Sequence, residues 1–134
     1  MATVEQLLMA KGPDVIVADS ATTALEAARL MAEAKVGFLI VRDGEEVRGV
    51  FTERDLLVRV VAKEKDPSAT PLRDVMTTPV ESCRLTDTLA QVAGVMAEKH
   101  IRHLVVMEDG AVIGVIGVRD VLAAQLGESA GPGR

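Results

Sequence analysis

The chain has 134 residues, 49% of them hydrophobic, and its 15 basic and 20 acidic side chains give a formal net charge of −5. This length and hydrophobicity suffice for one compact unit with a buried core, and the acidic balance argues against a general nucleic-acid binder. Phe38 and Phe51 are its only aromatic residues and Cys83 its only cysteine, which excludes a base-stacking surface, an internal disulfide and a cysteine-based zinc site.

The sequence predicts neither a signal peptide nor a membrane span. Residues 1–11 show no basic region followed by an apolar run, and the longest apolar stretches are too short to cross a bilayer. The acidic balance gives no reason to expect binding to an anionic membrane surface. The single cysteine fits a reducing compartment, so we expect a cytoplasmic protein.

In chain order, the first half begins with helix, extended run and helix. Residues 4–11 predict a short helix that ends at Gly12, and residues 14–17 form a short extended run. A second helix starts after Thr23, which forms a capping-box pattern with Glu26. Its apolar residues recur at the i, i+3, i+4, i+7 spacing of a buried helical stripe.

Two strands and a helix complete this half. The strands cover residues 38–41 and 47–51 on either side of an Asp43-Gly44 turn, which is the pattern of a β-hairpin. Both strands are apolar on both faces, so we expect both faces to be covered. Residues 53–63 then predict a helix with an apolar stripe.

The second half repeats the first at a displacement of 65 residues. The sequence Met31-Ala32-Glu33 falls on Met96-Ala97-Glu98, and Gly49-Val50 falls on Gly114-Val115. Only the Asp-Gly of the turn is displaced by one further residue. The second copy predicts an extended run at 79–82, a helix after Thr88 with Gln91 as its capping partner, strands at 104–107 and 112–116, and a helix at 118–126.

The predicted fold is therefore α/β (α+β), with two pseudosymmetric β-α-β-β-α repeats packed sheet to sheet in one module. Residues 1–12 form the leading helix, 13–66 the first repeat, 67–76 the linker, 77–126 the second repeat and 127–134 a flexible tail. Two proline-containing breakers lie in the linker region, and residues 72–76 are expected to form one helical turn.

Three motifs add a resemblance to a known family. The segment Gly49-Val50-Phe51-Thr52-Glu53-Arg54-Asp55 has the form Gly-x-x-(Ser/Thr)-x-x-Asp at a strand-to-helix junction. The segments Asp74-Val75-Met76-Thr77-Thr78-Pro79-Val80 and His100-Ile101-Arg102-His103-Leu104-Val105-Val106 resemble the entry and the strand entry of a second copy. Together with the repeat, they make the chain similar to a stand-alone tandem pair of cystathionine-β-synthase-type (CBS) domains, or Bateman module.

The resemblance implies a regulatory module rather than an enzyme. Such pairs commonly bind AMP, ATP, S-adenosylmethionine or a related adenosyl ligand in the cleft between the repeats, and they regulate an attached or partner protein. The resemblance also implies a homodimer. It names neither the regulated protein nor which adenosyl ligand is bound.

Thr52 and Asp55 are the first candidate site residues, and they have two interpretations. Thr-x-x-Asp at a helix start is a capping arrangement in its own right. The resemblance assigns the same two residues to a ligand, with the Thr52 hydroxyl and the helix start on phosphate and the Asp55 carboxylate on the ribose hydroxyls. Gly49 is expected to keep the backbone slim behind that ligand.

The resemblance places the second repeat's strand entry opposite this junction. Arg102 and His103 are there assigned to phosphate, with Arg54 as a third contact, although both also fit a solvated strand end. The backbone around Thr78, Pro79 and Val80 is expected to read the adenine edge.

The mirror site is expected to be the weaker one, because Gly117 replaces Thr52, and Gly37 and Phe38 stand where Arg102 and His103 do. Its remaining candidates are Asp14, Val15, Ile16, Phe38 and Asp120, with Phe38 as readily a core residue. We therefore expect one good nucleotide site per chain.

No catalytic group is apparent. His100 and His103 have no carboxylate or cysteine at metal-ligand spacing, no nucleophile has an evident base, and no Gly-Lys-(Ser/Thr) phosphate loop occurs. The competing interpretation is a structural or dimerisation module whose nucleotide site is vestigial.

Overall fold

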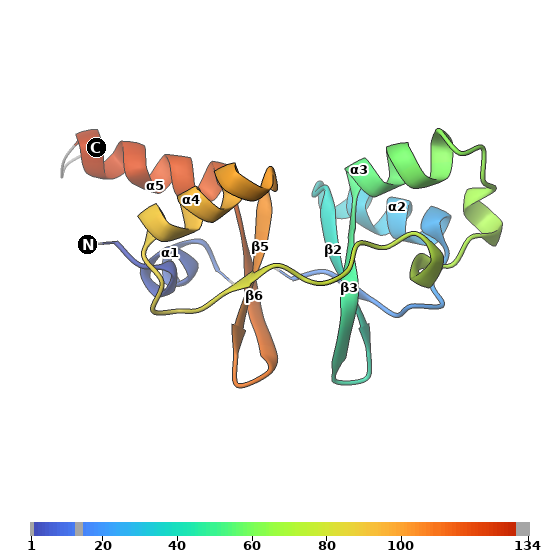
Figure 1. The fold of residues 1–134 in the computed structure, drawn as a ribbon, viewed down its shortest axis with the longest axis horizontal. Coiled ribbons are helices and arrows are strands. Elements are labelled where there is room, and N and C mark those ends of the chain that lie inside the picture. The colour runs from blue at the N-terminus through green and yellow to red at the C-terminus, as the bar shows by residue number, and fades with distance from the viewer. Residues whose placement is uncertain (1, 13–14, 131–134) are drawn as a thin grey trace. The chain divides into compact units, whose positions relative to one another are not determined.

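The computed structural model describes residues 2–12 and 15–130 and divides into two compact units (Figure 1). Residues 15–80 form one unit. The described residues of 1–14 and of 81–134 form the other. Each unit contains one three-stranded sheet, so the predicted mixed α/β fold with two repeated halves is confirmed.

The first unit holds the first repeat. Its sheet has the order β1-β2-β3, with β1 (Val17–Ala18) parallel to β2 (Phe38–Asp43) and β2 antiparallel to β3 (Glu46–Thr52). Helix α2 (Ala24–Ala34) connects the two parallel strands. In β1, Val17 and Ala18 pair with Ile40 and Val41 of β2, and Asp14, where the extended run was predicted to begin, lies outside the described residues.

The helix after β3 differs from its prediction in type and length. A single α-turn, α3 (Glu53–Asp55), passes into a π-type turn, η1 (Leu56–Val61). The segment therefore ends at Val61 and not at Lys63. The wider turn is closed by the Ala62 N–H, which donates to the Leu57 carbonyl oxygen at 2.9 Å.

The second unit repeats this architecture. Strands β4 (Ser82–Cys83), β5 (His103–Glu108) and β6 (Ala111–Gly117) pair in the order β4-β5-β6 with the same parallel and antiparallel senses. Helix α4 (Leu89–Lys99) connects the parallel pair, and α5 (Val118–Ala130) follows β6. Helix α5 runs to Ala130, past the predicted end at Leu126.

Both predicted capping boxes are present. In the first, the Glu26 N–H donates to the Thr23 hydroxyl at 3.1 Å, and the Thr23 N–H donates to the Glu26 carboxylate at 3.0 Å. Thr88 and Gln91 repeat the arrangement at 3.1 and 2.9 Å. The two connecting helices therefore start at equivalent residues, because local side-chain chemistry sets each start.

The two hairpins do not slip relative to each other. Asp43 pairs with Glu46 and Glu108 pairs with Ala111, so both loops have two residues at equivalent places. The Asp-Gly of the second loop lies in the turn with positive φ at both residues, as a type I′ hairpin requires. Asp43 instead ends its strand, where its carboxylate accepts from the Ser20 N–H at 2.9 Å and the Ser20 hydroxyl at 2.7 Å.

The segment that precedes each repeat packs on the other repeat. Helix α1 (Val4–Lys11) belongs to the second unit, where the Val4 N–H donates to the Asp87 carbonyl oxygen at 2.9 Å. The short 3₁₀ turns η2 (Pro67–Ala69) and η3 (Leu72–Asp74) belong to the first unit, where the Leu72 N–H donates to the Thr22 carbonyl oxygen at 2.8 Å. The two contacts are equivalent because Asp87 is the repeat counterpart of Thr22.

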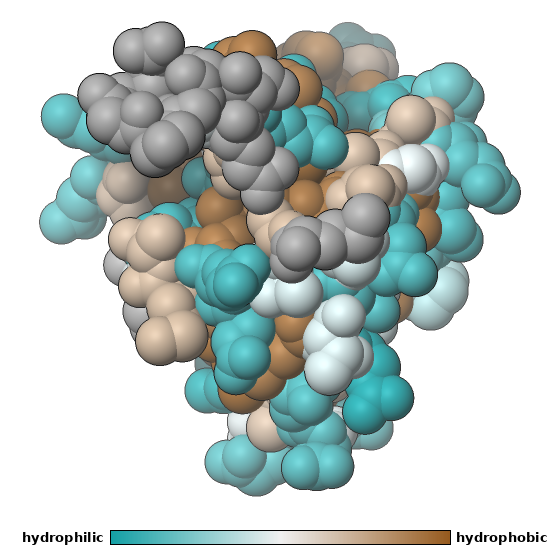
Figure 2. Space-filling view, turned by 90° about the vertical axis from the view of Figure 1, so that its left-hand side faces the viewer, coloured by the Kyte–Doolittle hydropathy of each residue, from teal (hydrophilic) through white to brown (hydrophobic). Residues whose placement is uncertain are grey.

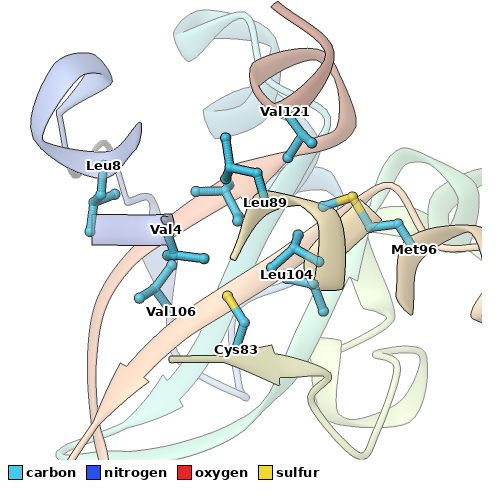
Figure 3. Packing of buried hydrophobic residues seen from close by; sticks show 10 residues of the cluster. Val4, Leu8, Cys83, Leu89, Met96, Leu104, Val106 and Val121 are labelled. Carbon is cyan, nitrogen blue, oxygen red and sulfur yellow. The ribbon is translucent and has the colours of Figure 1, made fainter. Parts of the chain in front are cut away.

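Each unit has its own core. In the second unit, Figure 3 shows side chains from α1, the sheet and both long helices pointing toward one another. The cluster consists of Val4, Leu8, Cys83, Leu89, Val92, Met96, Leu104, Val106, Ile116 and Val121. In the first unit, Leu39, Val41 and Phe51 pack with the buried face of α2 and with Leu72 of η3.

Alternate residues of the central strands lie outside these two clusters. In the first unit they are Phe38, Ile40 and Val50, and in the second they include Val105 and Val115. Because successive residues of a strand point to opposite faces, each sheet has a second apolar face besides the one under its helices. This matches the prediction that the strands are apolar on both sides.

Candidate functional site

The Thr52–Asp55 motif forms a complete capping box at the junction of β3 and α3. The Thr52 N–H donates to Asp55 Oδ2 at 3.0 Å, and the Thr52 hydroxyl lies 3.2 Å from the same oxygen. The Asp55 N–H donates to Thr52 Oγ1 at 3.2 Å. The capping interpretation of these residues is thus realised in the structure.

The other carboxylate oxygen of Asp55 also has two neighbours. The Thr77 hydroxyl donates to Asp55 Oδ1 at 2.7 Å, and Arg59 Nε lies 3.4 Å from it. The same arginine donates from Nη1 to the Met76 carbonyl oxygen at 3.1 Å. Asp55, whose side chain is 7% exposed, holds Thr77 against the start of the helix, and Arg59 holds Met76.

Gly49 makes room for this same segment. The Val50 N–H donates to the Thr77 carbonyl oxygen at 3.0 Å, and the Thr77 N–H donates back to Val50 at 2.8 Å. A Cβ at Gly49 would lie 2.7 Å from that Thr77 oxygen. The close neighbour of Gly49 in this structure is therefore the chain's own backbone, where the sequence suggested a ligand.

The equivalent junction in the second repeat is more open. The Gly117 N–H donates to Asp120 Oδ2 at 2.8 Å, and no hydroxyl replaces that of Thr52. Lys11, from the last turn of α1, places Nζ 3.8 Å from the same oxygen and donates to the Val115 carbonyl oxygen at 3.0 Å. The Asp120 side chain is 33% exposed.

His103 lies beside this second junction. It pairs with Gly117 across β5 and β6, and a Cβ at Gly117 would lie 3.3 Å from the His103 ring. A threonine at 117 would therefore crowd the imidazole. In the first repeat, Phe38 and Thr52 form the equivalent cross-strand pair, so each repeat has one large residue at this strand start.

The residues predicted to contact phosphate are divided between the units. Thr52 and Arg54 lie in the first unit, and Arg102 and His103 lie in the second. Arg54 and Arg102 are exposed, and the Arg102 carbonyl oxygen accepts from the Val118 N–H at 2.8 Å. A site that combines the two groups stays a prediction.

The predicted adenine-reading segments have equivalent places. Thr78, Pro79 and Val80 follow Thr77 along the chain, and the Thr78–Pro79 peptide bond is cis. In the other segment, Ile16 accepts from the Ile40 N–H at 2.9 Å, and Val15 precedes it. Asp14, predicted for the weaker site, lies outside the described residues.

Sequence reasoning missed Arg59, Thr77 and Lys11. Arg59 had a signal, because it follows Asp55 by four residues on a helix and such pairs face each other. Lys11 had none within its own repeat, since it reaches Asp120 only because α1 packs on the second unit.

Other features of the described residues do not suit a phosphate or a metal. A shallow groove between β1 and α2 is lined by Asp19, Glu26 and Glu33 with Arg29 as its only cation, which disfavours anions. The described residues contain no cluster of three or more metal-ligating side chains.

Burial, followed by the Asp87 charge, raises the pKa of the Cys83 thiol to about 12, so it is protonated at neutral pH. Among residues 2–12 and 15–130, no helix combines the length and apolarity of a membrane span.

The family model for the CBS domain matches residues 4–62 and 72–127. The chain therefore belongs to the CBS domain family and contains two copies of the domain in tandem. It is 34% identical over 114 residues to an uncharacterized protein of Methanopyrus kandleri, a match that covers 84% of this chain and 58% of that protein. It is 32% identical over 110 residues to CBS domain-containing protein YhcV of Bacillus subtilis, covering 81% and 78%.

Solved CBS structures have the same fold. A CBS-domain-containing protein from Agrobacterium tumefaciens superposes with a TM-score of 0.88 at 32% identity, over 92% of this chain and 99% of that one. A CBS domain protein from Pyrobaculum aerophilum, complexed with AMP, has a TM-score of 0.78 at 26% identity, over 92% and 98%. A CBS domain pair in complex with 5′-methylthioadenosine and S-adenosyl-L-methionine shares the fold at 22% identity and a TM-score of 0.84.

Proposed function

We propose that this chain is a regulatory module that binds an adenine nucleotide or a related adenosyl compound at its strand-to-helix junctions, and that it catalyses no reaction. The observation that carries the proposal is the pair of equivalent strand-to-helix junctions, each with an aspartate at the third helical residue. The AMP-bound Pyrobaculum relative supports the ligand class.

The chemistry of the junctions suits the parts of such a ligand. A carboxylate accepts hydrogen bonds from both hydroxyls of a ribose, which is a role for Asp55 or Asp120. Arg102, His103 and Arg54 supply positive charge for phosphate. The backbone near Thr78, Pro79 and Val80, or near Val15 and Ile16, would face the adenine.

Regulation would follow from a difference in ligand affinity between two conformations. A ligand shifts an equilibrium only by as much as it prefers one state over the other. Thr77 bonds to Asp55, and residues 77–80 lead along the chain from the first unit to the second. A ligand that moves Asp55 would therefore also move the segment that joins the two units. The regulated protein is then one that binds the two conformations unequally.

We further propose that the module is a homodimer. Leu57 and Val61 of η1 are 63% and 57% exposed, and their repeat counterparts Leu122 and Leu126 of α5 are 52% and 68% exposed. Figure 2 views the molecule from the side of α1, α4 and α5 and shows apolar side chains at the surface among hydrophilic ones. A second copy that covers these pairs would remove exposed apolar surface from water, and a twofold dimer uses the same patch on both copies.

A structural or dimerisation module with a vestigial nucleotide site is the alternative. The fully engaged Asp55 carboxylate favours it, because a ribose must displace existing contacts there. A thermal-shift screen distinguishes the two, since a ligand that binds only the native state raises its melting temperature as concentration rises. We expect AMP, ATP or S-adenosylmethionine to raise the melting temperature in a saturable manner while GMP does not. No shift with any adenosyl compound would favour the vestigial alternative.

A further inference from the structure

We infer that the groove between β1 and α2 of the first repeat is a docking surface for an extended, basic segment of a partner protein. The residues that line this groove include Val17, Asp19, Glu26, Arg29, Leu30 and Glu33, and all of them belong to the first unit. The inference goes beyond the proposed function and does not depend on a bound nucleotide.

One side of the groove is the edge of a sheet. Strand β1 ends the order β1-β2-β3 and pairs with β2 alone among the described strands. The Ile40 N–H of β2 donates to the Ile16 carbonyl oxygen at 2.9 Å, and in a parallel pair alternate residues make these bonds. Val17, one residue further on, therefore directs its N–H and carbonyl groups away from β2. An edge of this kind accepts a further strand through main-chain hydrogen bonds.

The other side of the groove carries negative charge that the unit does not balance. Asp19, Glu26 and Glu33 supply three carboxylates, and Arg29 supplies the only cation of the lining. Within the described part of the chain, none of these four side chains takes part in a salt bridge. A partner with basic side chains would supply the missing charge, and complementary charge of this kind selects between partners.

The second repeat indicates that the fold does not require this charge. The capping box of α2 uses Glu26, and that of α4 uses Gln91 with an equivalent hydrogen bond, at 3.0 and 2.9 Å. A neutral amide therefore serves the cap equally well. At the repeat position of Asp19 stands Arg84. Two of the three acidic positions are thus specific to the first repeat, so the negative groove is not a by-product of the repeated architecture.

The shape of the groove favours a peptide over a small molecule. The groove is shallow and open, whereas small ligands bind in clefts that enclose most of their surface. Leu30, 41% exposed, offers an apolar contact beside the carboxylates. Alternate side chains of a strand added to β1 would lie on the α2 side of the sheet. A segment with basic residues at every second position therefore brings their charges to Glu26 and Glu33.

Two short blocked peptides test the docking surface on the full chain. One alternates lysine with valine, and the other has glutamate in place of each lysine. We expect the lysine peptide to shift the backbone amide resonances of Val17 and Asp19 in a saturable manner, less strongly at high salt, and the glutamate peptide to leave them unchanged. A lysine peptide with N-methylated valines lacks half of its main-chain donors and should bind several-fold more weakly.

Substitutions without a change of shape test the charges. The double variant Glu26→Gln/Glu33→Gln should bind the lysine peptide roughly tenfold more weakly, about threefold for each exposed ion pair. Glutamine completes the same cap in α4, so the melting temperature of this variant should match that of the wild type. The matched control is Glu98→Gln, which removes the acidic side chain at the repeat position of Glu33 and should leave the peptide affinity unchanged.

Three results would overturn the inference. The first is equal binding of the lysine and glutamate peptides, or binding of neither. The second is an equal loss of affinity in Glu98→Gln and in the double variant. The third is a Val17 resonance that shifts with protein concentration when no peptide is present, which would assign the groove to a second copy of the chain. Titration with AMP tests the proposed function separately, because the substituted residues lie outside both strand-to-helix junctions.

Discussion

Single residues at equivalent positions of the repeats serve different neighbours. Gly49 lies against the Thr77 carbonyl oxygen, whereas a Cβ at its counterpart Gly114 would lie 2.6 Å from the side chain of Leu8. Gly49 therefore leaves room for the segment at Thr77, and Gly114 leaves room for helix α1. The difference is that Gly49 faces a backbone atom, which is fixed by its own hydrogen bonds to Val50.

A substitution at Gly49 should accordingly destabilise the fold. Gly49→Ala places a methyl group 2.7 Å from the Thr77 oxygen, and we expect the free energy of unfolding to fall by about 1 to 3 kcal/mol, as for other overpacked sites. Urea unfolding followed by circular dichroism measures it.

Gly94 is the matched control for this change. It lies inside α4, and a Cβ there meets no atom within 4 Å, so Gly94→Ala should raise the free energy of unfolding by about 0.5 to 1 kcal/mol. Equal effects of the two substitutions would contradict the packing described at Gly49.

Residues whose role is local could be predicted from the sequence. The Thr23 and Thr88 caps and the Thr52–Asp55 pair depend on atoms three residues apart, so their spacing is sufficient. Arg59 and Thr77 join Asp55 from four and 22 residues away. The second contact, like that of Lys11 with Asp120, depends on which half each segment packs against, and the repeat pattern does not contain that information.

At the scale of elements, α1 belongs to the core of the half that it does not precede. Val4 and Leu8 are buried in the same cluster as Cys83 (Figure 3). The pattern of residues 4–11 predicted the helix but not its partner, because the apolar face of a short helix fits any apolar surface. The η1 segment was likewise predicted as helical, but nothing in its residues indicated a π-type turn.

Loss of the α1 contact should open the second unit. Leu8→Ala removes a buried side chain and should lower the free energy of unfolding by about 2 to 5 kcal/mol. Because the Cys83 thiol is buried and has a pKa raised to about 12, it should react slowly with a thiol reagent in the native protein and faster in Leu8→Ala.

Met9 provides the neighbouring control. It is 81% exposed, so Met9→Ala should change the free energy of unfolding by less than about 0.5 kcal/mol and leave the labelling rate of Cys83 unaltered. If Leu8→Ala behaved like Met9→Ala, the assignment of α1 to this core would be wrong.

At the scale of the whole molecule, the two repeats leave equivalent apolar pairs uncovered. If a second copy covers them, replacing Leu57 and Leu122 together by aspartate should convert a dimer into a monomer, because two charges per chain would be buried at the interface. Size-exclusion chromatography with light scattering measures the mass. Met9→Asp, which places a charge at another exposed apolar residue, should leave the dimer intact. A wild type that is monomeric at high concentration would contradict the proposal.

The overall architecture was the most predictable level, since the displacement by 65 residues makes each half a check on the other. Element order, both sheets and both main capping boxes followed from it. The donors around the two aspartates were less accessible, because they depend on which segments pack against each junction in three dimensions.

The central claim is that this CBS pair binds an adenosine-containing ligand, and isothermal titration calorimetry with AMP tests it most directly. We predict a saturable heat with AMP that a matched titration with GMP does not produce. No saturable heat with AMP, ATP or S-adenosylmethionine, or equal affinities for AMP and GMP, would contradict the account.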